Sequence, residues 1–179
     1  MIDDPSARGP NLNIMTEPTL TPSKLWKRMT ADQRLRAARA FWLDEQATDD
    51  QIQAVLVIAQ QKKFRPKFVL SLDTDRKAKH LSGLFSLPDA LAARTLVVYH
   101  LAEQREMMGA FLDALNIPHE NGLIQDDAAK PDPEKIKPAV ATLREKYPPE
   151  DVTLYLETLV SQDPETWGAL REEGAIGAA

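Results

Sequence analysis

Two histidine–glutamate pairs are the residues of this sequence whose types and spacing could support acid–base or metal chemistry. His100 and Glu103 are three residues apart, so both side chains would lie on one face of a helix. Helical carboxylate metal sites use these residue types at this spacing, but in the order Glu-x-x-His and on two helices. Here the order is reversed, and the sequence holds no second such pair. Metal binding by His100 and Glu103 is therefore kept as an alternative only.

The second pair, His119 and Glu120, lies where an apolar segment ends. Asn116 suits the left-handed position just after a helix, and Pro118 prevents the helix from continuing. The Asn-Gly pair that follows Glu120 favours a tight turn, because both residue types tolerate positive φ. All of these residues have structural roles. We therefore interpret the stretch as a helix terminator and a turn rather than as a catalytic site.

Gln104 follows His100 by one turn, in the longest helix that we expect, which runs to about Leu115. The apolar stripe of this helix consists of Ala90, Ala93, Val97, Leu101, Met108, Leu112 and Leu115. On a helical wheel His100 flanks the stripe and Gln104 falls near its centre. A buried imidazole or amide without a hydrogen-bond partner costs about 1–3 kcal/mol. We therefore predict that His100 and Gln104 are a structural polar pair, with internal hydrogen bonds that fix the helix register.

Motifs that define common enzyme classes are absent from the sequence. The chain has no G-x-x-x-x-G-K-[ST] phosphate loop, no G-x-S-x-G nucleophile elbow, no H-E-x-x-H zinc motif and no dinucleotide-binding G-x-G-x-x-G. It has no cysteine, which excludes thiolate catalysis, disulfides and zinc–cysteine sites and fits a reducing compartment. We identify no catalytic residue and expect no cofactor. The sequence favours a non-catalytic protein.

A basic stretch at residues 62–80 is the best candidate for a binding region. Its cations are Lys62, Lys63, Arg65, Lys67, Arg76, Lys77 and Lys79. The stretch has a net charge of +5, whereas the whole chain carries −5, so the remainder carries −10. Nucleic-acid binding is one interpretation, because phosphate backbones require such a cluster. The other is a surface that faces acidic groups of this chain, of a second copy or of another protein.

Proline and capping residues mark helix starts along the whole chain. The expected starts lie at Thr21-Pro22, Thr30, Asp50, Arg65-Pro66, Asp73-Thr74, Pro88-Asp89, Asp132-Pro133, Pro138, Pro148-Pro149 and Asp163-Pro164. Apolar residues follow at helical spacing, most clearly at Ile52, Val55, Leu56 and Ala59. Alternating β-branched runs are nearly absent. The sequence therefore predicts an all-α fold of about eight helices with short loops and irregular, orthogonal or bundle packing.

Length and composition favour a soluble globular protein with a smaller C-terminal part. The chain has 179 residues, of which 43% are hydrophobic and 27% charged. We expect a mobile N-terminal arm at residues 1–20, a main helical domain at 21–125 and a C-terminal helical subdomain at 126–179, packed on the main domain or hinged to it. Met15 is an alternative initiating residue. No export signal or membrane-spanning run is present, so we expect a cytoplasmic protein.

Three hypotheses of function follow. The first is a protein–protein interaction or assembly module, whose partner is another protein or a second copy and whose contact regions are the arm and the basic stretch. The alternative is a nucleic-acid-binding protein that uses residues 62–80. The second alternative is a metal-dependent helical enzyme that uses His100 and Glu103. None of the three involves a membrane.

Overall fold

A computed structural model describes residues 20–172 and residue 176 of the chain. The described residues form the all-α fold that the sequence predicts, with one small two-stranded sheet. The elements are α1 (Pro22–Arg28), α2 (Ala31–Leu43), the 3₁₀ helix η1 (Glu45–Ala47), α3 (Thr48–Lys62), α4 (Pro66–Ser71), α5 (Thr74–Ser82), α6 (Asp89–Glu103), α7 (Arg105–Ala114), β1 (His119–Glu120), β2 (Leu123–Ile124), α8 (Pro133–Lys146), α9 (Pro149–Gln162), α10 (Pro164–Trp167) and α11 (Ala169–Glu172). The helices are shorter and more numerous than the eight expected.

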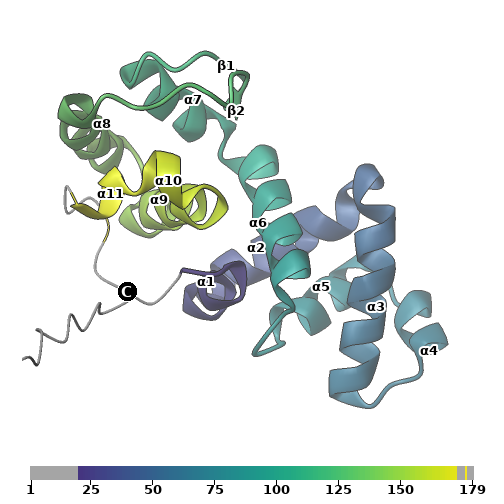
Figure 1. Cartoon of the computed structure of the whole chain (residues 1–179). Helices are drawn as coiled ribbons and strands as arrows, with labels where there is room; N and C mark the ends of the chain where they lie inside the picture. Colours follow the sequence, from purple (N-terminus) through teal and green to yellow (C-terminus); the bar gives the residue numbers. More distant parts are fainter. Residues whose placement is uncertain (1–19, 173–175, 177–179) are drawn as a thin grey trace, which may run out of the picture.

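Helix α6 runs between two groups of helices (Figure 1). The first group is α1–α5, in which α2 packs closely against both α5 and α6. The second group is α7–α11 with the β1–β2 hairpin, in which α7 packs against α8 and α9 packs against α10. The two groups also meet directly, because α1 contacts α9. One hydrophobic cluster contains buried residues of both groups.

Side-chain caps hold several helix starts at the positions that the sequence predicts. The Thr30 hydroxyl accepts a hydrogen bond from the Gln33 N–H, and the Gln33 side chain accepts one from the Thr30 N–H, so the capping box is formed. Asp73 caps α5 by accepting from the Arg76 N–H, and Asp132 caps α8 by accepting from the Glu134 N–H. Proline occupies the first turn of α1, α4, α8, α9 and α10, where its missing N–H removes no helical bond.

Two of the expected helix starts are wrong. Helix α3 begins at Thr48 and not after Asp50, because η1 leads directly into it. Pro138 does not start a helix but lies inside α8, which Pro133 has already opened. Proline removes one helical bond at such a position. The helix nevertheless continues, since the residues that follow Pro138 include a buried apolar face.

The longest expected helix is divided in two at Gln104. This residue has φ −121° and ψ 15°, outside the helical region, so α6 ends at Glu103 and α7 begins at Arg105. The two parts meet different neighbours: α6 packs on α1, α2 and α3, whereas α7 packs on α8 and the hairpin. A single straight helix could not make both sets of contacts. The break therefore lets one apolar segment serve both groups of helices.

Burial on α6 also differs from the predicted stripe. Ala90 is exposed and Ala93 is half-buried. The buried residues of α6 are Leu91, Ala92, Thr95, Leu96, Val98, Tyr99 and His100. The prediction assumed one buried face, but helices pack against α6 from more than one side. His100 consequently lies inside the protein rather than beside an apolar stripe.

Helix α3 buries only part of its predicted apolar face. Val55 and Ala59 are buried as expected. Ile52 and Leu56 are instead 51% and 47% exposed. Helix α3 contacts α4, α5 and α6, and its buried residues are Ala54, Val55, Ile58 and Ala59. Two large apolar side chains are thus left on the surface.

The chain turns after α7 as the sequence predicts. Asn116 has φ 54°, Asn121 has φ 51° and Gly122 has φ 85°, all in the left-handed region. The turn joins the antiparallel strands β1 and β2, which pair His119 with Ile124 and Glu120 with Leu123. The terminator and the turn are therefore confirmed. The short strands are an addition to the predicted fold.

The expected N-terminal arm falls outside the described residues except for Leu20, which is buried. In the part of the chain that the structure describes, no helix combines the length and the apolar character needed to cross a bilayer.

Gly122 offers a test of the hairpin geometry. A Cβ atom at this position would lie 2.8 Å from the Met108 Cβ, and the φ of 85° disfavours every residue with a side chain. We expect Gly122→Ala to lower the free energy of unfolding by about 1–3 kcal/mol. Asn121→Gly is the control, because glycine accepts the same left-handed backbone. Urea denaturation in which both variants match the parent chain would contradict this geometry.

Candidate functional site

The basic stretch lies on α3, α4 and α5 and faces solvent. Asp73 and Asp75, its two carboxylates, are already engaged: Asp73 with Arg76 at 3.6 Å and Asp75 with Arg39 of α2 at 3.1 Å. Lys77 lies 5.5 Å above the centre of the Trp42 ring. Within residues 62–80, the exposed cations that form no ion pair with another described residue are Lys62, Lys63, Arg65, Lys67 and Lys79.

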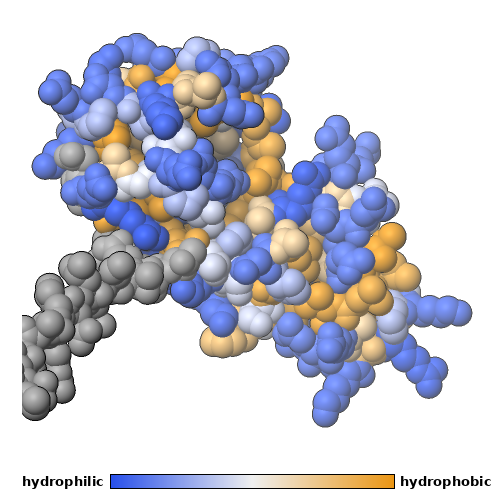
Figure 2. All heavy atoms as spheres, in the orientation of Figure 1, coloured by the Kyte–Doolittle hydropathy of each residue, from blue (hydrophilic) through white to orange (hydrophobic). Residues whose placement is uncertain are grey.

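Exposed apolar side chains accompany the first four of these cations. Phe68 and Leu70 of α4 are 49% and 56% exposed, and α4 packs against α3, on which Ile52 and Leu56 are also exposed. Figure 2 shows apolar residues at the surface where α3 and α4 lie. We call this region the α3–α4 surface. Its members are Ile52, Leu56, Lys62, Lys63, Arg65, Lys67, Phe68 and Leu70.

His100 is buried, and its two ring nitrogens differ. Nδ1 lies 2.8 Å from the carbonyl oxygen of Leu96, and since a carbonyl oxygen only accepts, Nδ1 carries the proton. Burial lowers the pKa of His100 to about 4, against the opposing effects of the Leu96 bond and of Asp151. The ring is therefore neutral at pH 7, and Nε2 holds a free lone pair. Nε2 has no hydrogen-bond partner within the described residues.

A pocket of about 320 Å³ adjoins His100. Residues of α6, α7, the hairpin, α9 and α10 line it. Val97, Leu101 and Met108, which the sequence assigned to a core stripe, form part of this lining. The apolar segment that was predicted to fill the core thus faces a cavity over part of its length.

The residues suspected of metal chemistry do not come together. Glu103 Oε2 lies 2.9 Å from Arg36 Nη1, while His100 bonds to the backbone of its own helix. The part of the chain that the structure describes contains no group of three or more His, Asp or Glu residues that could hold a metal ion. The predicted pair with Gln104 is not bonded either, because Gln104 Nε2 contacts the Tyr99 hydroxyl at 3.4 Å.

His119 forms a local structural contact. The Gly122 N–H donates to Nδ1 at 3.1 Å, so the other nitrogen, Nε2, carries the proton and donates to Asp113 Oδ1 at 3.0 Å. His119 thereby ties the hairpin turn to the end of α7. The Glu120 side chain is exposed on β1.

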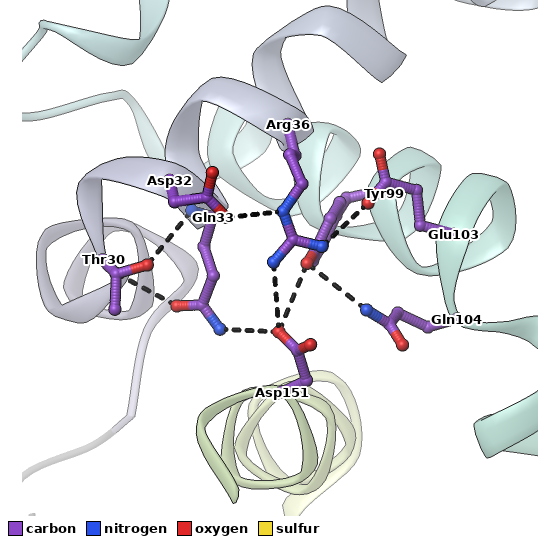
Figure 3. A network of polar contacts seen from close by, with 8 residues as sticks. All are labelled: Thr30, Asp32, Gln33, Arg36, Tyr99, Glu103, Gln104 and Asp151. Atoms are coloured by element: carbon purple, nitrogen blue, oxygen red, sulfur yellow. Dashed lines mark hydrogen bonds and ion pairs between the residues drawn. The ribbon is translucent and has the colours of Figure 1, made fainter. Parts of the chain in front are cut away.

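Asp151 is the centre of a buried polar network that joins three helices (Figure 3). It lies in the first turn of α9, with 7% of its surface exposed. Its Oδ1 accepts from Gln33 Nε2 of α2 at 3.0 Å and from the Tyr99 hydroxyl of α6 at 3.4 Å. Arg36 Nη2 lies 3.5 Å from the same oxygen. The network therefore holds the second group of helices against the first.

Arg36 and Tyr99 owe their electrostatic state to this network. Burial raises the pKa of Tyr99 to about 12, with Asp151 adding to the effect and Gln104 opposing it. Partial burial lowers the pKa of Arg36, but Tyr99, the bonds to Asp32 and Glu103, and Asp151 together raise it. The network thus joins the Asp151 carboxyl group to a guanidinium and to a tyrosine that is neutral at pH 7, which suits positioning rather than proton transfer.

A second ion pair joins the same two groups of helices. Arg28, the last residue of α1, lies 2.9 Å from Glu157 of α9. Burial raises the pKa of the Glu157 carboxyl, and Arg28 and Arg171 oppose that shift. Because the Arg28 side chain is half-exposed, solvent screens this pair more than the Asp151 network.

Sequence reasoning missed the network almost completely. Gln33 completes the capping box with Thr30, and its amide N–H₂ group donates to Asp151 as well. Asp151 resembles an ordinary acidic residue in a first helical turn. Only the contact between α2 and α9 gives it a different role.

Comparison with known proteins assigns no family. No family model matches the chain, and no curated protein or solved structure matches it either. The function must therefore be argued from the surface, the pocket and the network.

We expect Asp151→Ala to lower the free energy of unfolding by about 2–4 kcal/mol, since it leaves the Gln33 amide and the Tyr99 hydroxyl buried without their acceptor. Glu150→Ala is the matched control, because Glu150 lies in the same turn of α9 but is exposed. We expect this variant to change the free energy of unfolding by no more than about 0.5 kcal/mol. Urea denaturation measures both. Equal effects would show that the network does not stabilise the contact between α2, α6 and α9.

His100 should make stability depend on pH. In the unfolded chain its pKa is about 6.5, and in the folded protein it is about 4. The unfolded state therefore binds the extra proton between these values, so stability falls as the pH drops from 6.5 to 4, by up to about 3 kcal/mol from this group. His100→Phe lacks this contribution. Parallel pH profiles of the variant and the parent chain would contradict the burial of a neutral imidazole.

Proposed function

We propose that the protein is a non-catalytic interaction module that binds an acidic, amphipathic helix of a partner protein at the α3–α4 surface. The observation that supports this proposal is the exposure of large apolar side chains beside cations that have no carboxylate partner. Neither feature is needed for the fold.

The apolar side chains supply the hydrophobic part of the proposed contact. Ile52, Leu56, Phe68 and Leu70 are each about half exposed or more. Covering such surface yields about 25 cal/mol for each Å² of apolar area. Apolar side chains gathered on neighbouring helices are typical of protein-binding sites, whereas single scattered ones are not.

Helical spacing on α3 favours a helix as the partner. Ile52 and Leu56 are four residues apart, so they form a ridge along one exposed face of α3. Such ridges pack into the grooves of another helix. Lys63, the left-handed residue just after α3, places a cation at the C-terminal end of this helix.

The four cations specify the charge of the partner. Lys62, Lys63, Arg65 and Lys67 are exposed and unpaired within the described residues, so acidic side chains on a partner helix would complement them. Charges at the edge of an interface mainly raise the association rate and select the partner. The apolar ridge would then supply most of the affinity.

Nucleic-acid binding is the second candidate, and Phe68 is the observation that favours it. A half-exposed aromatic ring between cations can stack on a base. Phosphate contacts and stacking would use the cations and Phe68 but leave Ile52 and Leu56 uncovered. Because these two α3 side chains belong to the same surface, the protein partner accounts for more of it.

Photo-crosslinking tests the proposal. A photoreactive phenylalanine at position 68 is compared with one at the exposed position 134 of α8, in extracts of the organism that encodes the chain. We expect one defined protein to crosslink at 68 and not at 134. Leu56→Ser, and separately the change of Lys62, Lys63, Arg65 and Lys67 to Glu, should each reduce the product at least about tenfold.

The matched control changes Lys130, Lys135, Lys137 and Lys146 to Glu, which alters the net charge by the same amount away from the α3–α4 surface. This control should leave the crosslinked product unchanged. A product that survives Leu56→Ser and the charge reversal would remove this surface from the proposal. A crosslinked product that nuclease removes would show that the surface binds nucleic acid, the second candidate, and not a protein. A crosslink to a second copy of the chain would overturn the proposed class of partner.

A further inference from the structure

The pocket beside His100 is a second feature that the fold does not require. Residues of α6, α9, α10 and the hairpin line it, and no residue of the α3–α4 surface does. Its volume of about 320 Å³ is at the lower end of the range for small-molecule sites. Apolar side chains supply much of its wall, including Val97, Leu101, Leu159 and Trp167.

The ring of His100 adds a buried polar group to this wall, whose other polar side chains include Thr158 and Gln162. Its Nδ1 proton is already used by Leu96, so Nε2 can only accept a hydrogen bond. Nε2 is buried and has no partner among the described residues. An unmade hydrogen bond of a buried polar atom is costly, and such atoms are rare in folded proteins. A donor on a molecule in the pocket would complete this bond.

Acidic residues determine which charge the pocket tolerates. Asp126 and Asp127 are exposed where they line it, and Asp163 is half-exposed. Hydrogen bonds from Thr166 lower the pKa of Asp163, so this carboxylate stays ionised at pH 7. A ligand with a negative charge would meet three like charges. Neutral or positively charged molecules would not be repelled by these carboxylates.

We propose that this pocket binds a small, mainly apolar molecule that carries one hydroxyl or N–H donor for His100 Nε2 and no negative charge. The apolar body lies among Val97, Leu101 and Trp167, and the donor points to the histidine. The proposal is independent of the α3–α4 surface, since none of its residues belongs to that surface.

Three fluorinated probes test the chemistry on the whole chain. 4-Fluorophenol carries a hydroxyl donor, 4-fluoroanisole has the same ring but no donor, and 4-fluorobenzoate is an anion. ¹⁹F NMR line broadening measures binding of each. We expect 4-fluorophenol to bind about tenfold more tightly than 4-fluoroanisole, the usual effect of one hydrogen bond, and 4-fluorobenzoate to bind most weakly.

The position of the probe is read from the indole N–H signal of Trp167, which Trp167→Phe assigns. We expect 4-fluorophenol to shift this signal, because Trp167 lines the pocket. In His100→Phe the preference for 4-fluorophenol over 4-fluoroanisole should disappear. His80→Phe is the matched control, since His80 lies on α5 against Phe64 and outside the pocket; it should keep the preference.

Equal binding of 4-fluorophenol and 4-fluoroanisole to the parent chain would overturn the proposal, as would a Trp167 signal that does not respond. A preference that persists in His100→Phe would remove His100 from the site and overturn the role given to Nε2. If His100→Phe does not fold, the comparison of probes on the parent chain and the Trp167 signal still decide the matter.

Discussion

One buried carboxylate oxygen connects the two groups of helices. Asp151 Oδ1 accepts from Gln33 of α2 and Tyr99 of α6 and lies near the guanidinium of Arg36. A buried carboxylate is costly unless several donors surround it, so this contact is favourable only when α2, α6 and α9 are all in place. The arrangement of α7–α11 relative to α1–α5 depends on it. The pocket depends on the same arrangement, because α6 and α9 both line it.

The sequence was sufficient for local structure and insufficient for contacts between distant elements. Caps and prolines act within one helical turn, and for that reason Thr30, Asp73 and Asp132 were placed correctly. The break at Gln104 was missed, since it arises from the different neighbours of α6 and α7. Pro138 was misread because a buried face carries α8 through it.

The same difference between local structure and contacts between distant elements applies to the candidate sites. The composition of residues 62–80 identified the cations, but periodicity placed Ile52 and Leu56 in the core, where the structure has them exposed. A helical wheel assumes that a helix has one buried face. It gives no information on how many other helices pack against that helix. His100 is buried as well, and its ring packs against Tyr155 of α9. The two proposed sites therefore lie where the assumption of a single buried face fails.

The order of synthesis gives the Asp151 network a further consequence. Gln33 and Asp151 are 118 residues apart, so α1–α6 leave the ribosome well before α9 does. Synthesis adds about 5–20 residues per second, so the donors on α2 and α6 exist for several seconds before Asp151, their acceptor, has been made. The nascent N-terminal half must keep Gln33, Arg36 and Tyr99 hydrated during this interval. The contact between α2, α6 and α9 therefore forms only after residue 151 has been synthesised.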